Sequence, residues 1–142
     1  MRAVVDTNLL VSGLLWGRNP GQLMSAARGG SLRLCSSEIL LAELRVVLGR
    51  AKFAARLTAR GVTADAVLAS ARSICEIFDP PAMPMPPDLR DPKDLAVLAC
   101  AVTSEADAII TGDEDLLALK SFQGIPIIKA AEALEKLGMQ RE

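Results

Sequence analysis

Apolar residues along this chain form two kinds of pattern that alternate from end to end. Short, nearly continuous apolar runs are typical of strands that are buried on both faces of a parallel sheet. The longer stretches between them carry apolar residues at helical spacing. The runs that predict strands are Arg2 to Val5, Leu32 to Cys35, Cys75 to Phe78, Ala108 to Thr111 and Ile125 to Ile128. This alternation predicts an α/β protein whose parallel sheet is covered by helices on both faces.

Helical spacing of apolar residues and the positions of glycines predict the helices. Glycines close several of these stretches, as expected at helix ends. The predicted helices are Gln22 to Arg28, Ser37 to Leu48, Lys52 to Ala59, Thr63 to Arg72, Lys93 to Ser104 and Ala130 to Leu137. The segment DPPAMPMPPDLRDP, residues 79 to 92, has five prolines within nine residues from Pro80. It predicts a stiff, extended connector inside the domain.

The size and composition of the chain favour one compact domain. With 142 residues and 51% hydrophobic content, we expect residues 1–142 to form a single domain with a real core. The three cysteines are widely spaced and are expected to be small core residues. The longest uncharged apolar run, about eight residues from Leu95, is far shorter than the roughly twenty that a membrane span needs. The N-terminus lacks the pattern of a signal peptide, so we expect a cytoplasmic protein.

The amino acids that are missing narrow the possible chemistry. The chain has no histidine, which excludes nucleophilic catalysis of the Ser-His and Cys-His types and imidazole metal sites. It has no tyrosine and only 3% aromatic residues, so aromatic stacking is a poor basis for nucleic-acid binding. The net charge of -1 means that any nucleic acid would be bound by a local patch. An enzyme of this composition would depend on carboxylates and a metal ion.

Two aspartates follow predicted strands from opposite halves of the chain. Asp6 interrupts an apolar region directly after the first strand, where an unpartnered carboxylate would be costly. Asp113 follows the fourth strand. Ligands of open parallel sheets bind beyond the carboxyl ends of the strands, so these two acids are expected to meet there.

Two more acids belong to predicted helices. Glu43 follows Ile39 by four residues and falls near an inward stripe that we expect to comprise Ile39, Leu40, Leu44 and Val47. Asp94 lies in the first turn of a helix that is apolar almost all round, so its side chain is expected to point back toward the sheet end. Four carboxylates in one cleft would repel each other unless a divalent cation neutralised them, and magnesium or manganese suits such an all-oxygen site.

Each acid also has an ordinary structural explanation. Asp91 before Pro92 is a good N-cap, and Asp94 then complements the helix dipole. Thr111 and Glu114 fit a capping box, with Asp113 in the first turn. Glu43 fits a simple helix-face charge, and Glu38 fits a solvated first-turn acid. Asp6 would be a cap only if a helix began at Thr7 or Asn8, which the pattern does not predict.

Four motifs resemble, in order and spacing, those of PIN-domain ribonucleases, and most closely the VapC-like toxins of toxin-antitoxin systems. These motifs are VVDTNLLVSGLLW, SSEILLAEL, RDPKDLAVLACAV and ADAIITGDEDLL. The resemblance extends over nearly the whole chain, including KFAARLT, the proline-rich connector and GIPII. It implies a three-layer α/β/α fold with a central parallel sheet of about five strands.

The resemblance also implies an activity: an endoribonuclease, dependent on Mg²⁺ or Mn²⁺, that hydrolyses RNA phosphodiester bonds. Its catalytic residues would be Asp6, Glu43, Asp94 and Asp113, of which Asp6, Asp94 and Asp113 would bind the metal, with Asn8, Thr111 and Asp115 in supporting roles. The family implies a cognate antitoxin and a homodimer as partners. Arg18, Arg90 and Lys93 are candidates for phosphate contacts or are ordinary solvated charges.

Two other functions stay open at this point. A phosphatase with an aspartyl nucleophile after the first strand usually needs a second aspartate two residues later, where this chain has Asn8. A non-catalytic PIN-like binding module would keep the fold without assembling the acids.

Overall fold

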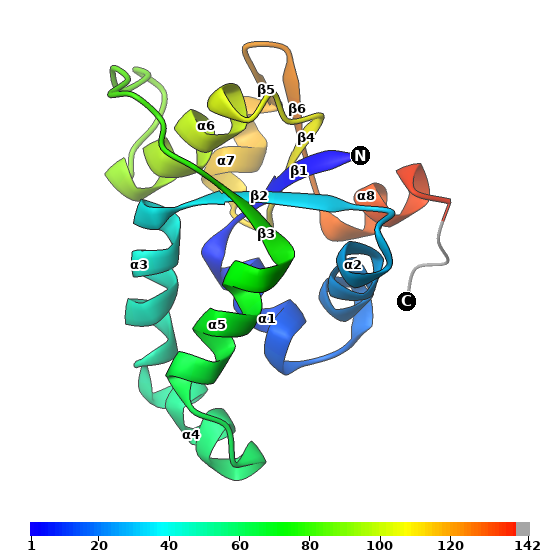
Figure 1. Ribbon diagram of the computed structural model, residues 1–142. Helices are drawn as coiled ribbons and strands as arrows, with labels where there is room; N and C mark the ends of the chain where they lie inside the picture. The colour runs from blue at the N-terminus through cyan, green and yellow to red at the C-terminus, as the bar shows by residue number, and fades with distance from the viewer. Residues whose placement is uncertain (139–142) are drawn as a thin grey trace.

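The computed structural model describes residues 1–138 and forms a central sheet covered by helices (Figure 1). The elements are, in chain order, β1 (Arg2–Val5), α1 (Thr7–Leu15), α2 (Arg18–Gly29), β2 (Arg33–Ser37), α3 (Glu38–Leu48), α4 (Ala51–Arg60), α5 (Ala64–Ile74), β3 (Cys75–Phe78), α6 (Pro92–Thr103), β4 (Ala108–Ile110), α7 (Glu114–Leu119), β5 (Ser121–Phe122), β6 (Ile125–Ile128) and α8 (Ala130–Lys136). No helix in this described part is long and apolar enough to cross a membrane.

The sheet has the strand order β3-β2-β1-β4-β6-β5, and all neighbouring strands are parallel except β6 and β5, which are antiparallel. β1 lies near the middle, where Val4 pairs with Cys35 of β2 and with Ile109 of β4. The five predicted strands are therefore confirmed. The two-residue β5 adds an antiparallel edge through a hairpin at Gln123 and Gly124, where both φ angles are positive, 48° and 81°. Such a two-residue turn joins antiparallel strands directly.

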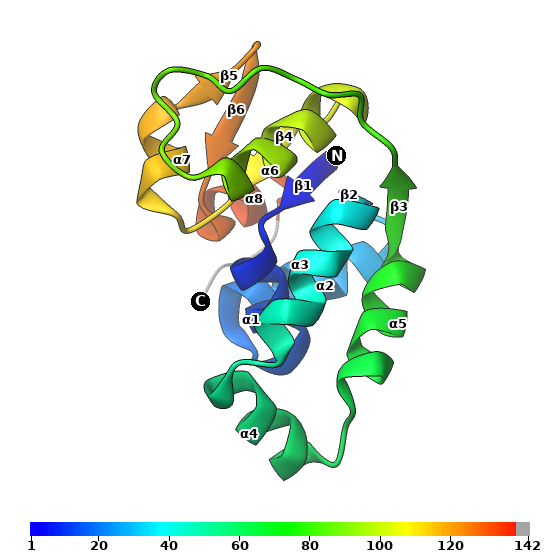
Figure 2. The same cartoon turned by 90° about the vertical axis from the view of Figure 1, so that its left-hand side faces the viewer.

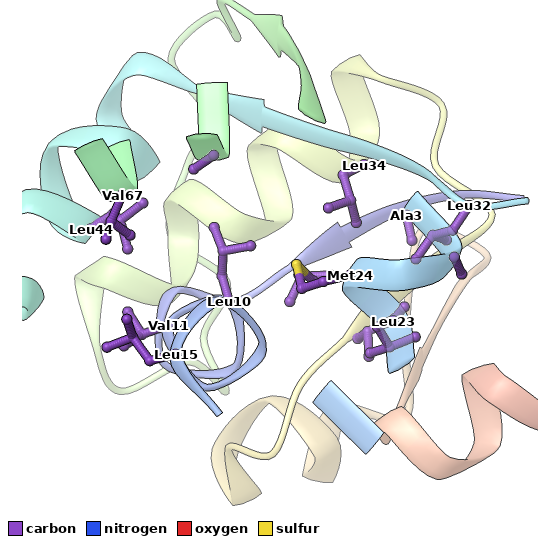
Figure 3. Packing of buried hydrophobic residues seen from close by; sticks show 14 of the residues in the cluster. Ala3, Leu10, Val11, Leu15, Leu23, Met24, Leu32, Leu34, Leu44 and Val67 are labelled. Atoms are coloured by element: carbon purple, nitrogen blue, oxygen red, sulfur yellow. The ribbon is translucent and has the colours of Figure 1, made fainter. Parts of the chain in front are cut away.

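Alternation along β1 supplies both halves of the core. Ala3 and Val5 belong to a cluster with α1, α2, α3, α5 and α8, while Val4 belongs to a second cluster with α6 and α7. Figure 3 shows part of the first cluster, where side chains of the helices meet those of β1 and β2. Successive strand side chains point to opposite faces, so one strand contributes to both layers. The predicted three-layer α/β/α fold is thus confirmed.

α1, which begins immediately after Asp6, was not predicted from the sequence. The pattern there is ambiguous because the nine-residue helix is apolar on several sides and contains a glycine. That glycine, Gly13, permits close packing of α1 on α2: a Cβ there would lie 2.7 Å from Met24 Cγ and 2.7 Å from the carbonyl oxygen of Pro20. A helix that is held by such a tertiary contact does not need a clean amphipathic pattern.

Other differences between prediction and structure are smaller. α7 was also not predicted, and α2 begins at Arg18, four residues before the predicted start. The other bounds agree within two residues. The assumed inward stripe of α3 was partly wrong, because Ile39 is 66% exposed and the buried residues are Leu40, Leu41, Leu44, Val47 and Leu48. The proline-rich connector forms no helix or strand, and the cysteines are free, with two of them buried.

Candidate active site

A cavity of about 390 Å³ opens at the carboxyl end of β1, and the four predicted acids all line it. Asp6 comes from the end of β1, Asp113 from the start of α7, Asp94 from the first turn of α6 and Glu43 from the middle of α3. The rest of the lining comprises Thr7, Asn8, Leu9, Ser12, Lys93, Val97 and Gly112. Four elements that are distant in sequence therefore contribute carboxylates to one hollow.

Asp6 joins the sheet to the first helix. Its N–H donates to the carbonyl of Ile110 at 3.1 Å, and its Oδ1 accepts the N–H of Leu9 at 2.8 Å as the N-cap of α1. Its Oδ2 accepts a hydrogen bond from the hydroxyl of Thr111. Asp6 is thus a helix cap, contrary to expectation, and still lines the cavity. Burial raises the pKa of Asp6, although the hydrogen bond from Thr111 works in the opposite direction.

Thr111 ties two of the acids together. It lies at the end of β4 with no exposed surface, and its hydroxyl also accepts the N–H of Asp113 at 2.9 Å. The predicted capping box of Thr111 and Glu114 is wrong, since α7 begins at Glu114 and Asp113 is the N-cap, accepting the N–H of Asp115 at 2.9 Å. The buried hydroxyl therefore positions the acids and does not cap a helix.

Asp94 is the most perturbed carboxylate of the site. Its side chain is on α6, the residue is only 8% exposed, and Oδ2 is buried without a hydrogen-bond partner among the described residues. Burial raises the pKa of Asp94 to about 7, and the charge of Asp113 adds to this effect. Asp91, by contrast, caps α6 by accepting the N–H of Lys93 at 2.9 Å, with Pro92 at the first helical position, as predicted.

Glu43 lies on the opposite wall. It is half-buried, and its Oε2 accepts a hydrogen bond from the hydroxyl of Thr7 at 3.1 Å. Asn8 lines the cavity, whereas Asp115 does not line it and acts on the site through its charge, which contributes to the raised pKa of Asp94. Of the three candidate cations, Lys93 lines the cavity, while Arg18 and Arg90 are exposed and lie outside its lining.

Sequence reasoning missed Thr7 and Ser12 as part of this cavity. Both lie on α1, and Ser12 follows Asn8 by four residues, the spacing of one helix face. A prediction of α1 would have placed Ser12 on the same helix face as Asn8 from the spacing alone. Without that helix, nothing in the sequence distinguishes Ser12 from a loop residue.

The donor set of the cavity fits a hard divalent cation. All candidate ligands are oxygens, and the buried, unpartnered Oδ2 of Asp94 lacks the positive charge or donor that such an atom needs. Across residues 1–138, however, no three acidic, histidine or cysteine side chains are close enough together to hold an ion. Binding would therefore require a side-chain adjustment, for which the exposed Asp113 has room.

The sequence model of the family described as PIN domain matches residues 2–115 of this chain. The chain therefore belongs to the PIN domain family, and the matched region includes all four acids. A comparison with curated proteins gives no match. Among solved structures, the chain resembles one from the crystal structure of VapBC2 from Rickettsia felis bound to a DNA fragment from their promoter. That match has a TM-score of 0.58 and 15% identity, and it covers 91% of this chain and 98% of the other. It supports the PIN fold.

Proposed function

We propose that this PIN domain is a metal-dependent endoribonuclease that hydrolyses RNA phosphodiester bonds in the cytoplasm. One observation carries the proposal: four carboxylates from four separate elements line one cavity, and within residues 1–138 the buried Oδ2 of Asp94 has no hydrogen-bond partner. A protein gains no stability from such uncompensated charge, so a ligand is the better explanation of it.

Within this proposal, Asp6, Asp94 and Asp113 would hold a magnesium or manganese ion. When bound, that ion supplies Lewis-acid polarisation of a phosphoryl oxygen and a lower pKa for the attacking water. Thr111 fixes the orientation of Asp6, because its hydroxyl occupies Oδ2 of that residue. The hydroxyl of Thr7 occupies one oxygen of Glu43 and leaves the other free to accept a proton from water. Lys93, at the cavity lining, supplies a positive charge for a phosphate oxygen.

The aspartyl-phosphatase alternative is disfavoured by the residue two positions after Asp6. Where that chemistry usually has a second aspartate, Asn8 lines the cavity, and its amide cannot act as a general acid or base. The hydrogen bonds that Asp6 accepts from the N–H of Leu9 and from Thr111 orient its carboxylate and leave lone pairs for a cation.

A nuclease assay tests the proposal directly. Single-stranded RNA should be cut in the presence of Mn²⁺ or Mg²⁺ and left intact with chelator, and Asp6→Asn should abolish cutting. Asp88→Asn is the matched control, since Asp88 is exposed in the connector and does not line the cavity. Absence of metal-dependent cutting by the unmodified chain would favour the non-catalytic binding module.

We further propose that the chain is the toxin of a toxin-antitoxin pair, with a cognate antitoxin as its partner. The motif resemblance to VapC-like toxins and the structural likeness to a chain of a VapBC2 complex support this role.

We also propose that residues 1–142 form a single domain. β6 and α8 lie beyond the matched family region, yet β6 pairs with β4 in the same sheet and α8 packs on α2.

A homodimer is the last part of the proposal. It rests on the resemblance of the sequence motifs to a family that implies a homodimer. Light scattering of the unmodified chain tests it: the expected mass is that of two copies related by symmetry, and the mass of a single copy would contradict it.

A further inference from the structure

Positive charge is concentrated on α4 and the residues around it. Residues 44–64 contain five basic residues and no acidic one, although the whole chain has 17 acidic and 16 basic residues. Arg45 pairs with Asp65 of α5 at 3.0 Å. The other four make no ion pair among the described residues: Arg50, Lys52, Arg56 and Arg60. α4 therefore presents uncompensated positive charge on a protein whose net charge is -1.

Contacts with the end of α1 hold part of this charge in position. Arg60 and Arg56 donate to the carbonyl of Leu15, at 2.5 and 3.5 Å, where α1 ends. The ammonium of Lys52 lies 5.9 Å from the ring centre of Trp16 and 5.4 Å from that of Phe53. Cations fixed over aromatic rings and at a helix C-terminus lose little further freedom when they bind an anion.

The basic helix is connected to the acid cavity by a groove. This groove lies between α3 and α6. Its polar lining residues are Glu43, Lys93 and Arg50, and the first two of these also line the acid cavity. The rest of its lining is apolar and comprises Ile39, Ala42, Val46, Pro92 and Ala96. α1 makes a second connection, since Asn8 and Ser12 line the cavity and the helix ends against α4. Figure 2 shows α1 and α3 side by side, both extending from the sheet toward α4.

We propose that α4, through Arg50 and Lys52, binds phosphates of the single-stranded RNA that flanks the bond to be cut. The inference rests on the proposed function. The cavity itself is lined by four carboxylates and one lysine, so it repels a phosphate chain unless cations elsewhere attract it. Net charge gives no general attraction, and phosphate affinity must come from a local cluster of Lys and Arg. α4 is such a cluster, and its groove leads to the cavity.

An acidic protein segment is the competing occupant of α4. RNA fits the position better, because the groove from Arg50 continues into the cavity at Glu43 and Lys93. An RNA strand bound along this path has a phosphodiester bond to present there, whereas an acidic peptide would bring only further carboxylates toward Glu43.

The test compares two double variants that change the net charge equally. Arg50→Gln with Lys52→Gln removes two exposed cations at the start of α4, and Lys129→Gln with Lys136→Gln removes two exposed cations at α8. Binding of a labelled, mixed-sequence single-stranded RNA of about 20 nucleotides, longer than the ~4–16 that small domains cover, is measured by fluorescence anisotropy with chelator present. The salt concentration is varied from about 50 to 200 mM, where phosphate contacts dominate the change in affinity.

The α4 variant should bind RNA on the order of tenfold more weakly, with a salt slope reduced by ~1.4 for two lost phosphate contacts. The α8 variant should bind like the unmodified chain. The exchange variant, Arg50→Lys with Lys52→Arg, keeps both charges and should bind RNA like the unmodified chain. It therefore distinguishes an effect of lost charge from an effect of disturbed folding. In cleavage assays the α4 variant should raise KM and leave kcat unchanged.

Equal RNA affinity of the α4 and α8 variants would overturn the inference. So would an α4 variant that loses affinity for a poly-glutamate peptide and keeps its affinity for RNA. Anisotropy requires no cutting, so a chain that binds RNA through α4 and fails to cut it would support this inference while refuting the proposed hydrolysis.

Discussion

The hydroxyl of Thr111 donates a hydrogen bond to Asp6, and the two residues are 105 positions apart in the sequence. They lie at the ends of the neighbouring strands β4 and β1, and the same hydroxyl accepts the N–H of Asp113. One buried threonine thus connects two acids of the cavity, Asp6 and Asp113, that come from opposite halves of the chain. Because Asp6 also caps α1, the position of that helix depends on the same small network.

Thr111→Val should lower the free energy of unfolding by about 1–3 kcal/mol, because Asp6 Oδ2 and the N–H of Asp113 both lose a partner in a partly buried place. It should also weaken Mn²⁺ binding, since Asp6 would be oriented less firmly. Denaturant unfolding and calorimetric titration measure the two effects. Thr111→Ser keeps the hydroxyl and should retain most of the metal affinity; equal loss in both variants would mean that the methyl group matters and the hydrogen bonds do not.

The two aspartates of the RDPKD segment, Asp91 and Asp94, should have different roles that mutations can distinguish. Asp91→Ala removes the N-cap of α6 and should cost on the order of 1 kcal/mol of stability while leaving metal-dependent cleavage largely intact. Asp94→Asn should keep the fold and abolish cleavage, because an amide lacks the charge that a cation requires. Thermal melts and the RNA assay on both variants test this assignment. The assignment is reversed if Asp94→Asn lowers the melting temperature and only Asp91→Ala lowers activity.

Without metal, the protein should lose stability as the pH rises from about 4 to about 7. The pKa of Asp94 is about 7 in the folded protein, against an ordinary value of 3.8, so the folded state holds its proton more tightly than the unfolded chain does. Ionising Asp94 in its buried site is therefore a cost that is absent at low pH and complete above about pH 7. Other carboxylates also titrate in this range, so the informative quantity is the difference between two proteins.

The protein to compare with the unmodified chain is the Asp94→Asn variant, which cannot ionise at this position. In chelator, it should melt several degrees above the unmodified chain near pH 8 and lose this advantage near pH 4, since ~1 kcal/mol corresponds to about 2–8 °C for small domains. Melting curves across this range measure the difference. A difference that does not vary with pH would show that Asp94 is not the perturbed group.

Manganese should raise the melting temperature of the unmodified protein. A ligand that binds only the folded state at 100 times its Kd contributes ~2.7 kcal/mol, and the clustered acids would be relieved of their repulsion. The shift should vanish in Asp6→Asn and persist in Asp88→Asn.

A crystal grown with Mn²⁺ should place the ion on Asp6 and Asp113, with contacts near ~2 Å. An ion bound elsewhere would leave the helix-cap roles of these two residues as their whole explanation.

The sequence alone determined the strands and most of the helices. Nearly continuous apolar runs such as Ala108 to Ile110 predict buried parallel strands, because both faces of such a strand are covered by helices. It also identified the acids: a carboxylate directly after a buried run, as at Asp6, needs a partner, and parallel strands present their carboxyl ends at one edge. Asp91 and Pro92 predicted the start of α6 because capping is a local interaction.

Only the tertiary structure decided what depends on contacts between distant segments. α1 is stabilised by packing of Gly13 against α2, so its own pattern could not predict it, and the capping role of Asp6 and the place of Ser12 were missed with it. The exposure of Ile39 depends on which side of α3 meets the sheet. The raised pKa of Asp94 depends on burial and on charges that folding brings near. A sequence specifies local geometry and the need for a partner, whereas long-range packing decides which partner is within reach.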